Sequence, residues 1–234
     1  MFGHRGVRGA APENTMAAFE LARTSGADGV ELDVRVCRTG ELVVCHDATL
    51  ERYTKNRDPR AVADLAFSDL RAIDVGDGER VPLLDDVLAW ATAHDLRVNV
   101  EMKRDVPRRR DVVRQTARAL AGLGAKLPTI IVSSFDPWML AYFAWLLPGV
   151  LRGSLFASDQ RLVRSGWPAR VLRTEAVHPD RTLVDERRFS KWKSAGRLVN
   201  VWTVNDPAEA RALAALGVDA IITDVPKSIT ESVR

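Results

Sequence analysis

The sequence has little cysteine and no long apolar segment. Its two cysteines, Cys37 and Cys45, are too few for a disulfide framework. Its first residues, Met1 to His4, lack the charged segment and apolar run of a secretion signal. The longest apolar run, Trp138–Leu147, has ten residues, about half of the ~20 that a membrane-spanning helix requires. We therefore expect a cytoplasmic protein without a transmembrane helix.

Lysine is also scarce, and no lysine-rich tract occurs. The 34 basic side chains nearly balance 31 acidic ones, so the net charge is only +3, which argues against a nucleic-acid partner. Hydrophobic residues make up 46% and charged residues 28% of the 234 positions, which is ordinary globular usage. We expect one packed domain over residues 1–234 that acts on a small molecule.

Segments typical of strands alternate with segments typical of helices along the chain, a pattern that indicates an α/β protein with a parallel sheet. The expected strands are Met1–Arg5, Gly29–Val34, Glu41–His46, Arg97–Met102, Thr129–Ser133, Val150–Leu155, Ala176–His178, Leu198–Val204 and Ala220–Thr223. The expected helices are Thr15–Thr24, Leu84–His94, Arg110–Leu123, Pro137–Leu147, Leu183–Ala195 and Pro207–Leu216, with a short one at Ser68–Ile73.

Two of these strands, Gly29–Val34 and Glu41–His46, are joined by a segment too short for a helical crossover and must form a β-hairpin. If Thr39-Gly40 is a two-residue turn, Asp33 lies opposite His46, with their Cβ atoms roughly 4.5–5.5 Å apart. The same register places Cys37 opposite Leu42 and Cys45 opposite Val34, which disfavours a disulfide.

Eight strands remain for parallel pairing. This number and the chain length favour an eight-stranded (β/α)8 TIM barrel. A doubly wound sheet is the alternative, but it usually carries a glycine-rich phosphate loop after its first strand, and neither GxGxxG nor GxxxxGK[ST] occurs in the sequence.

Ionisable residues gather at the ends of the expected strands, where barrels carry their active sites. Residues two apart in a strand share a face, so Glu31 projects with Asp33, and Glu101 with Lys103. The strand-end candidates are His4, Arg5, Glu31, Asp33, His46, Glu101 and Lys103.

Three of these candidates, Glu31, Asp33 and Glu101, would repel one another without a cation between them. All-oxygen ligation suits Mg²⁺ or Ca²⁺, and zinc is disfavoured because neither HExxH nor CxxC occurs. We expect one divalent cation, Mg²⁺ or Ca²⁺.

The remaining candidates suit the cleavage of a phosphate ester. The imidazoles of His4 and His46 can act as proton donor and acceptor near neutral pH. Arg5 and Lys103 add fixed positive charge that stabilises a phosphate group. A metal-dependent phosphodiesterase is therefore the reaction class that we expect.

At these positions the chain resembles the glycerophosphodiester phosphodiesterase family, and the likeness extends over almost the whole sequence. The motifs that carry it are His4-Arg5-Gly6, Pro12-Glu13-Asn14-Thr15, Glu31-Leu32-Asp33-Val34, His46-Asp47, Val100-Glu101-Met102-Lys103, Ser133-Ser134-Phe135-Asp136, His178-Pro179, Val201-Trp202-Thr203-Val204-Asn205 and Gly217 to Asp224.

The resemblance implies a barrel like that of phospholipase C that hydrolyses glycerophosphodiesters to sn-glycerol 3-phosphate and an alcohol. By motif position it implies metal ligation by Glu31, Asp33 and Glu101. It also implies an acid/base pair, His4 and His46; phosphate contacts from Arg5 and Lys103; and a pocket-lining aromatic, Trp202. A small insertion at about 47–82 would cover the active site, and its stretch from Tyr53 to Arg60 departs from the family's usual TTxGxG-like stretch.

The segment Trp138–Leu147 has no charged residue, whereas barrel helices normally show a polar outer face. We expect an apolar external patch there that serves a homodimer interface or, as the second choice, peripheral membrane contact.

Two other functions stay open at this point. Lysophospholipase D activity would apply the same chemistry to lysophospholipids at a membrane surface. A non-catalytic barrel scaffold is the alternative of another class, against which stands the complete set of chemically active residues.

Overall fold

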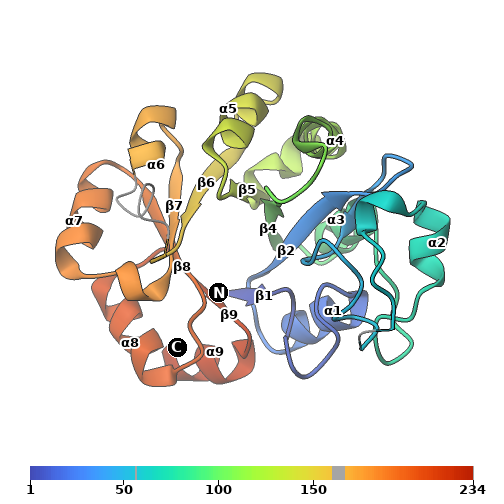
Figure 1. Ribbon diagram of the computed structural model, residues 1–234. Helices are drawn as coiled ribbons and strands as arrows, with labels where there is room; N and C mark the ends of the chain where they lie inside the picture. Colours follow the sequence, from blue (N-terminus) through green and yellow to red (C-terminus); the bar gives the residue numbers. More distant parts are fainter. Residues whose placement is uncertain (56, 160–166, 234) are drawn as a thin grey trace.

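Eight parallel strands close into a barrel with helices around it (Figure 1), which confirms the expected fold class. The structure, a computed structural model, describes residues 1–55, 57–159 and 167–233. The pairing of the first strand with both the second and the last strand of the barrel closes the ring. The parallel strands are β1 (Phe2–His4), β2 (Gly29–Val36), β4 (Arg97–Met102), β5 (Ile130–Ser134), β6 (Leu151–Phe156), β7 (Ala176–Pro179), β8 (Leu198–Val201) and β9 (Ala220–Thr223).

Helices follow the strands in the alternating order that the sequence predicts. Thr15 caps the first helix by accepting a hydrogen bond from the Ala18 backbone N–H, and Gly217 ends another in a left-handed conformation with φ 94°. The helices are α1 (Met16–Thr24), α2 (Phe67–Ala72), α3 (Leu84–Ala93), α4 (Arg109–Ala121), α5 (Pro137–Leu146), α6 (Trp167–Leu172), α7 (Glu186–Ser194), α8 (Pro207–Leu216) and α9 (Pro226–Val233).

Two helix predictions need correction. The helix expected from Leu183 begins only at Glu186, because Asp185 caps it and a 3₁₀ turn occupies Arg181–Leu183. Helix α6 was not expected; it has only six residues, and short segments give a weak periodic signal.

The barrel strands are buried on both faces, as parallel strands are when helices cover the sheet. In β2, Val30, Leu32 and Val34 are fully buried and join the main hydrophobic core with residues of the surrounding helices. The alternate residues Glu31 and Asp33 are also buried, at 4% and 1% exposure. Side chains alternate along a strand, so the apolar outward face anchors the strand while its inward face carries carboxylates.

The predicted hairpin forms, but its predicted register is wrong by one residue. Strand β3 (Leu42–Val44) runs antiparallel to β2, with Val34 opposite Val44 and Val36 opposite Leu42. Asp33 is therefore opposite Cys45, not His46, and the Cys45 N–H donates to the Asp33 carbonyl at 2.9 Å. The expected pairings of Cys37 with Leu42 and Cys45 with Val34 are wrong for the same reason.

The cause is a turn of three residues instead of two. The Gly40 N–H donates to the Cys37 carbonyl and the Cys37 N–H donates to the Glu41 carbonyl, both at 3.1 Å. Gly40 has φ 103°, which fits the common hairpin in which a left-handed residue follows a tight turn. Both cysteines are free and buried, which confirms that they form no disulfide.

The segment after β3 adds a small second layer beside the hairpin. Leu50, Val62 and Leu70 are buried there against Cys37 and Val43 from the hairpin. This cluster holds the segment from 47 to 82 at the side of β2 and β3, so its first residues reach the strand ends.

Gly6 and Gly40 make a matched pair for testing how the turn after β1 constrains the fold. Both have positive φ, but a Cβ at Gly6 would lie 2.5 Å from the Ala18 backbone, whereas a Cβ at Gly40 meets no atom within 4 Å. Gly40→Ala should cost about 1 kcal/mol for the left-handed conformation alone. Gly6→Ala should cost at least ~2 kcal/mol because the helix must also move.

Urea denaturation of both variants measures the difference. Equal losses in the two variants would show that the contact between the β1 turn and α1 does not constrain the structure.

Candidate active site

A pocket of about 200 Å³ opens at the carboxyl ends of the barrel strands, the end where barrel enzymes carry their active sites. It brings together seven of the eight residues singled out from the sequence. Asp33, the eighth, is almost fully buried and contacts two of the others instead of lining the pocket. The lining residues are His4, Arg5, Glu31, His46, Asn99, Glu101, Lys103, Phe135, Leu155, Trp202 and Ile222.

Three carboxylates converge beside the pocket. One oxygen from each of Glu31, Asp33 and Glu101 lies within 4.8 Å of the others, and all three residues are buried. Burial and the neighbouring carboxylates raise the pKa of Glu31 well above its usual value, and burial also raises that of Glu101. A hard divalent cation would relieve this repulsion, so the donor set fits Mg²⁺ or Ca²⁺.

Arg5 and Lys103 already compensate part of this negative charge. The Lys103 Nζ lies 3.0 Å from Glu101 and 3.3 Å from Asp33, whose other oxygen is 3.2 Å from the Arg5 Nε. Burial alone would raise the pKa of Asp33, but these two cations outweigh it and lower that pKa. Burial opposes the charge on Lys103 too, and the attraction of Glu101 and Asp33 raises its pKa instead.

His4 is held by a carboxylate from the far end of the chain. Its Nδ1 lies 2.7 Å from Asp224 Oδ1, and its Nε2 is 3.9 Å from Glu31. Asp224 follows β9 and is itself fixed by the side-chain amide of Asn205 at 2.7 Å. A carboxylate on Nδ1 leaves Nε2 as the ring atom that can exchange a proton in the pocket.

His46 is also paired with a carboxylate, that of the residue that follows it in the sequence. Its Nδ1 lies 2.6 Å from Asp47 Oδ1, and Arg52 forms an ion pair with the same carboxylate. Burial, together with the positive charges of Lys103 and Arg5, holds the pKa of His46 below its usual value.

The backbone at His46 is fixed by Tyr53. The Tyr53 hydroxyl accepts a hydrogen bond from the His46 N–H at 2.9 Å and from the Asp47 N–H at 3.2 Å. Tyr53 occupies one of the positions where the sequence departs from the usual insertion motif. The departure therefore supplies a direct contact to the backbone of a candidate catalytic histidine.

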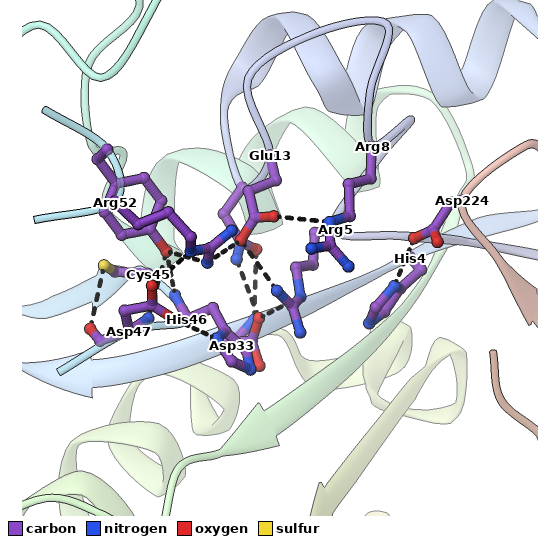
Figure 2. A network of polar contacts seen from close by, with 12 residues as sticks. His4, Arg5, Arg8, Glu13, Asp33, Cys45, His46, Asp47, Arg52 and Asp224 are labelled. Atoms are coloured by element: carbon purple, nitrogen blue, oxygen red, sulfur yellow. Dashed lines mark hydrogen bonds and ion pairs between the residues drawn. The ribbon is translucent and has the colours of Figure 1, made fainter. Parts of the chain in front are cut away.

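Figure 2 shows how one buried glutamate links this segment to Arg5. Glu13 accepts hydrogen bonds from Arg5 Nη1 at 2.9 Å and from Arg52 Nη2 at 2.6 Å, and it pairs with Arg8 at 3.1 Å. Asn14, the next residue, donates to Asp33 at 2.9 Å. The Pro12-Glu13-Asn14-Thr15 motif thus supports the phosphate-binding and metal-binding candidates from behind.

Trp202 and Phe135 form the apolar wall of the pocket. Their rings meet edge to face with centroids 5.6 Å apart. The Trp202 Nε1–H donates to the His178 carbonyl at 2.8 Å, which fixes the orientation of the indole. Trp202 is therefore placed where the sequence predicted an aromatic lining residue.

The other two histidines lie outside the pocket lining. His178 is fully buried beside Gly153 and Asn200, and burial lowers its pKa to about 3, so it is neutral. His94 is at the exposed end of α3, where its Nδ1 lies 2.8 Å from the Trp90 carbonyl oxygen.

Sequence reasoning missed several contacts around the site. The pairing of Asp224 with His4 spans 220 positions, and no local pattern signals it. The links from Arg52 and Tyr53 also went unnoticed, because both residues are in a segment without strong periodicity.

Comparison with known proteins agrees with this geometry. A sequence model described as the Glycerophosphoryl diester phosphodiesterase family matches residues 4–228. The chain belongs to this family. A glycerophosphodiester phosphodiesterase from Caldanaerobacter subterraneus is 30% identical over all of this chain and 97% of its own length, and one from Bacillus altitudinis is 30% identical over 97% and 94%.

Solved structures of the family share the fold of this member. A phosphodiesterase from Oleispira antarctica, solved in complex with the product sn-glycerol-3-phosphate, superimposes with a TM-score of 0.88 at 26% identity, over 99% of this chain and 95% of that one. A glycerophosphodiester phosphodiesterase from Agrobacterium tumefaciens gives 0.82 at 27% identity, over 99% of both chains. The expectation of a glycerophosphodiester phosphodiesterase is confirmed.

The raised pKa of Glu31 predicts how the stability of this phosphodiesterase depends on pH. Because folding favours the protonated carboxyl, the contribution of Glu31 to the stability of the metal-free protein should be fully present below about pH 4.5, the usual glutamate value. That contribution should be lost as the pH rises through the higher pKa of the folded state. Glu31→Gln should abolish this loss and melt at least ~2 °C above the native protein at pH 8 in EDTA.

Thermal denaturation between pH 4.5 and 8 tests this expectation, with Glu186→Gln on exposed α7 as the control for the loss of one charge. Added Mg²⁺ or Ca²⁺ should raise the melting temperature of the native protein but not that of Glu31→Gln. Parallel pH profiles for the native protein and Glu31→Gln would contradict the arrangement of charges described above.

Proposed function

We propose that the protein hydrolyses glycerophosphodiesters to sn-glycerol 3-phosphate and an alcohol. The observation that carries the proposal is the pocket, which is lined by Glu31, Glu101, two carboxylate-paired histidines and the buried side chains of Arg5 and Lys103, with Asp33 directly behind them. The Oleispira relative was solved with the same glycerol phosphate product, which supports this choice of substrate.

Glu31, Asp33 and Glu101 are the proposed ligands of one divalent cation, Mg²⁺ or Ca²⁺. When bound, the ion supplies positive charge that stabilises the phosphodiester as negative charge builds up on it. Arg5 and Lys103 lie against the same carboxylates, and we assign them to the phosphate oxygens. Trp202 and Phe135 lie in the same pocket and offer an apolar surface to the glycerol carbons.

The two histidines are the proposed acid and base. One takes a proton from the nucleophile at its Nε2, and the other gives a proton to the alkoxide of the departing alcohol. Asp224 and Asp47 hold the Nδ1 atoms, so each ring keeps one orientation and one tautomer. The nucleophile is water or the glycerol 2-hydroxyl, and a cyclic phosphate seen by ³¹P NMR identifies the second route.

The reaction predicts release of glycerol 3-phosphate from glycerophosphocholine by the purified protein. Because charge on the phosphate must be balanced, EDTA should stop the release and added Mg²⁺ or Ca²⁺ should restore it. A coupled assay for glycerol 3-phosphate measures both effects. Failure on glycerophosphocholine together with release from a micellar lysophospholipid would replace the proposal with lysophospholipase D activity, and failure on both would favour a scaffold.

Removal of either acid/base group should nearly abolish turnover. His4→Ala and His46→Ala should each lower kcat by roughly 10²–10⁴-fold, because general acid and base catalysis contribute about that much each. His94→Ala, at the exposed end of α3, is the matched control and should retain the native rate. Circular dichroism confirms folding, and a folded His46→Ala with native activity would refute the assignment.

The expected cytoplasmic location also stays a proposal. Both thiols are unpaired and buried, as is typical of proteins from a reducing compartment, and fractionation of the source cells tests it.

A further inference from the structure

Two side-chain stripes run along neighbouring helices on the outside of the barrel. Arg110, Arg114 and Arg118 are spaced by four residues along α4, and all three are exposed. Trp138, Tyr142 and Trp145 follow a similar spacing along α5, and the two tryptophans are 78% and 75% exposed. These six residues define the α4–α5 face, at whose edge Arg118 also lines a second groove with Glu41 and Asp85.

The stripes are joined to each other. The Arg114 Nε–H donates to the Tyr142 hydroxyl at 2.8 Å, and the guanidinium lies 6.0 Å from the centre of the same ring. Tyr142 in turn stacks against Trp145 with centroids 6.0 Å apart. The arginine and aromatic side chains therefore form one surface, on adjacent helices that Figure 1 shows side by side.

A groove of about 500 Å³ runs between the stripes and lacks the carboxylate and histidine set of the active site. Arg110, Arg114, Trp138 and Tyr142 line it, together with Val113, Met139 and the ion pair of Arg109 with Asp136 at 3.1 Å. The groove thus offers positive charge along one wall and aromatic rings along the other.

Much of the positive charge on this face is not neutralised. Within the described part of the chain, Arg110 and Arg118 have no carboxylate within 4 Å, and Arg114 reaches Asp111 only at 3.9 Å. A partner for the face must therefore supply negative charge as well as an apolar layer. Arginine beside interfacial tryptophan and tyrosine is the composition of surfaces that lie in the headgroup region of a bilayer.

We propose that the α4–α5 face binds the surface of membranes that contain anionic phospholipids. The phosphate groups of the lipid would pair with the three arginines, and Trp138 and Trp145 would enter the boundary between headgroups and acyl chains. Within the described residues, no helix has the length and apolar character to cross a membrane, so the contact is peripheral.

A second copy of the chain fits this face less well. The large apolar residues of α5 that would make a dry interface, Met139, Leu140 and Phe143, are buried in the barrel's own core. What remains outside is aromatic and cationic, and a two-fold contact would bring the positive charges of both copies together. An anionic lipid surface complements both features.

The proposed face begins next to the active-site pocket. Phe135 lines the pocket, and the following residue, Asp136, lines the groove and caps α5. Membrane binding through this face would therefore bring the pocket close to the headgroup layer. The inference does not depend on the proposed reaction, because vesicle binding is measured without substrate.

Cosedimentation with vesicles tests the proposal. The native protein should pellet with phosphatidylglycerol/phosphatidylcholine vesicles at 50 mM NaCl, remain in solution with pure phosphatidylcholine, and dissociate as salt screens the charges. Trp138→Ser/Trp145→Ser should lower the partition coefficient at least about tenfold. The same loss is expected for the triple variant Arg110→Gln/Arg114→Gln/Arg118→Gln. Each arginine near an anionic surface raises the partition coefficient several-fold.

The matched control removes three exposed arginines from other helices. Arg71→Gln/Arg187→Gln/Arg211→Gln changes the net charge equally but leaves the α4–α5 face intact, so it should bind like the native protein. Circular dichroism spectra and melting temperatures should match those of the native protein in all three variants, which shows that they fold.

Three results would overturn the proposal. The first is absence of binding of the native protein to the anionic vesicles. The second is an equal loss in the control triple variant, which would mean that net charge alone drives adsorption. The third is a dimer in sedimentation velocity that the Trp138→Ser/Trp145→Ser variant dissociates, which would assign the face to a second copy of the chain.

Discussion

Repulsion among three buried carboxylates is the constraint on which the site depends. Glu31, Asp33 and Glu101 lie within 4.8 Å of one another, an arrangement that burial makes costly. Arg5 and Lys103 compensate part of the charge, and the raised pKa values of Glu31 and Glu101 show that the compensation is incomplete. The remaining negative charge is what the proposed divalent cation would neutralise.

The barrel makes this arrangement possible because the carboxylates project from strands that neighbouring strands and core packing hold in place. Strand β2 pairs with β1 on one side and β4 on the other, and its outward residues are fully buried in the core. The site can then carry strain without unfolding the strands that hold it. The site also depends on closure of the ring, because only the pairing of β1 with β9 brings Asp224 to His4.

The segment after β3 links the side chains that hold His46 to those that hold Arg5, the proposed phosphate-binding residue. Arg52 joins Asp47 to Glu13, and Glu13 holds Arg5, as Figure 2 shows. His46 and Arg5 are thus coupled through charged side chains that contact each other away from the pocket. Asp47, Arg52 and Glu13 hold these two proposed site residues without lining the pocket themselves, so we expect changes in the segment to alter turnover and substrate choice together.

The sequence by itself determined the alternation of strands and helices, and hence the barrel, because hydrophobic periodicity and helix caps are local signals. It also determined that Glu31 projects with Asp33 and Glu101 with Lys103, since side chains two apart in a strand share a face, whereas Trp202 was identified only through the resemblance to the family. The hairpin register was wrong by one residue because Gly40 adopts a left-handed conformation that its neighbours do not reveal. Only the tertiary structure decided that Asp224 is the partner of His4 and that Arg114 contacts Tyr142, because contacts between distant segments exist only once the ring has closed.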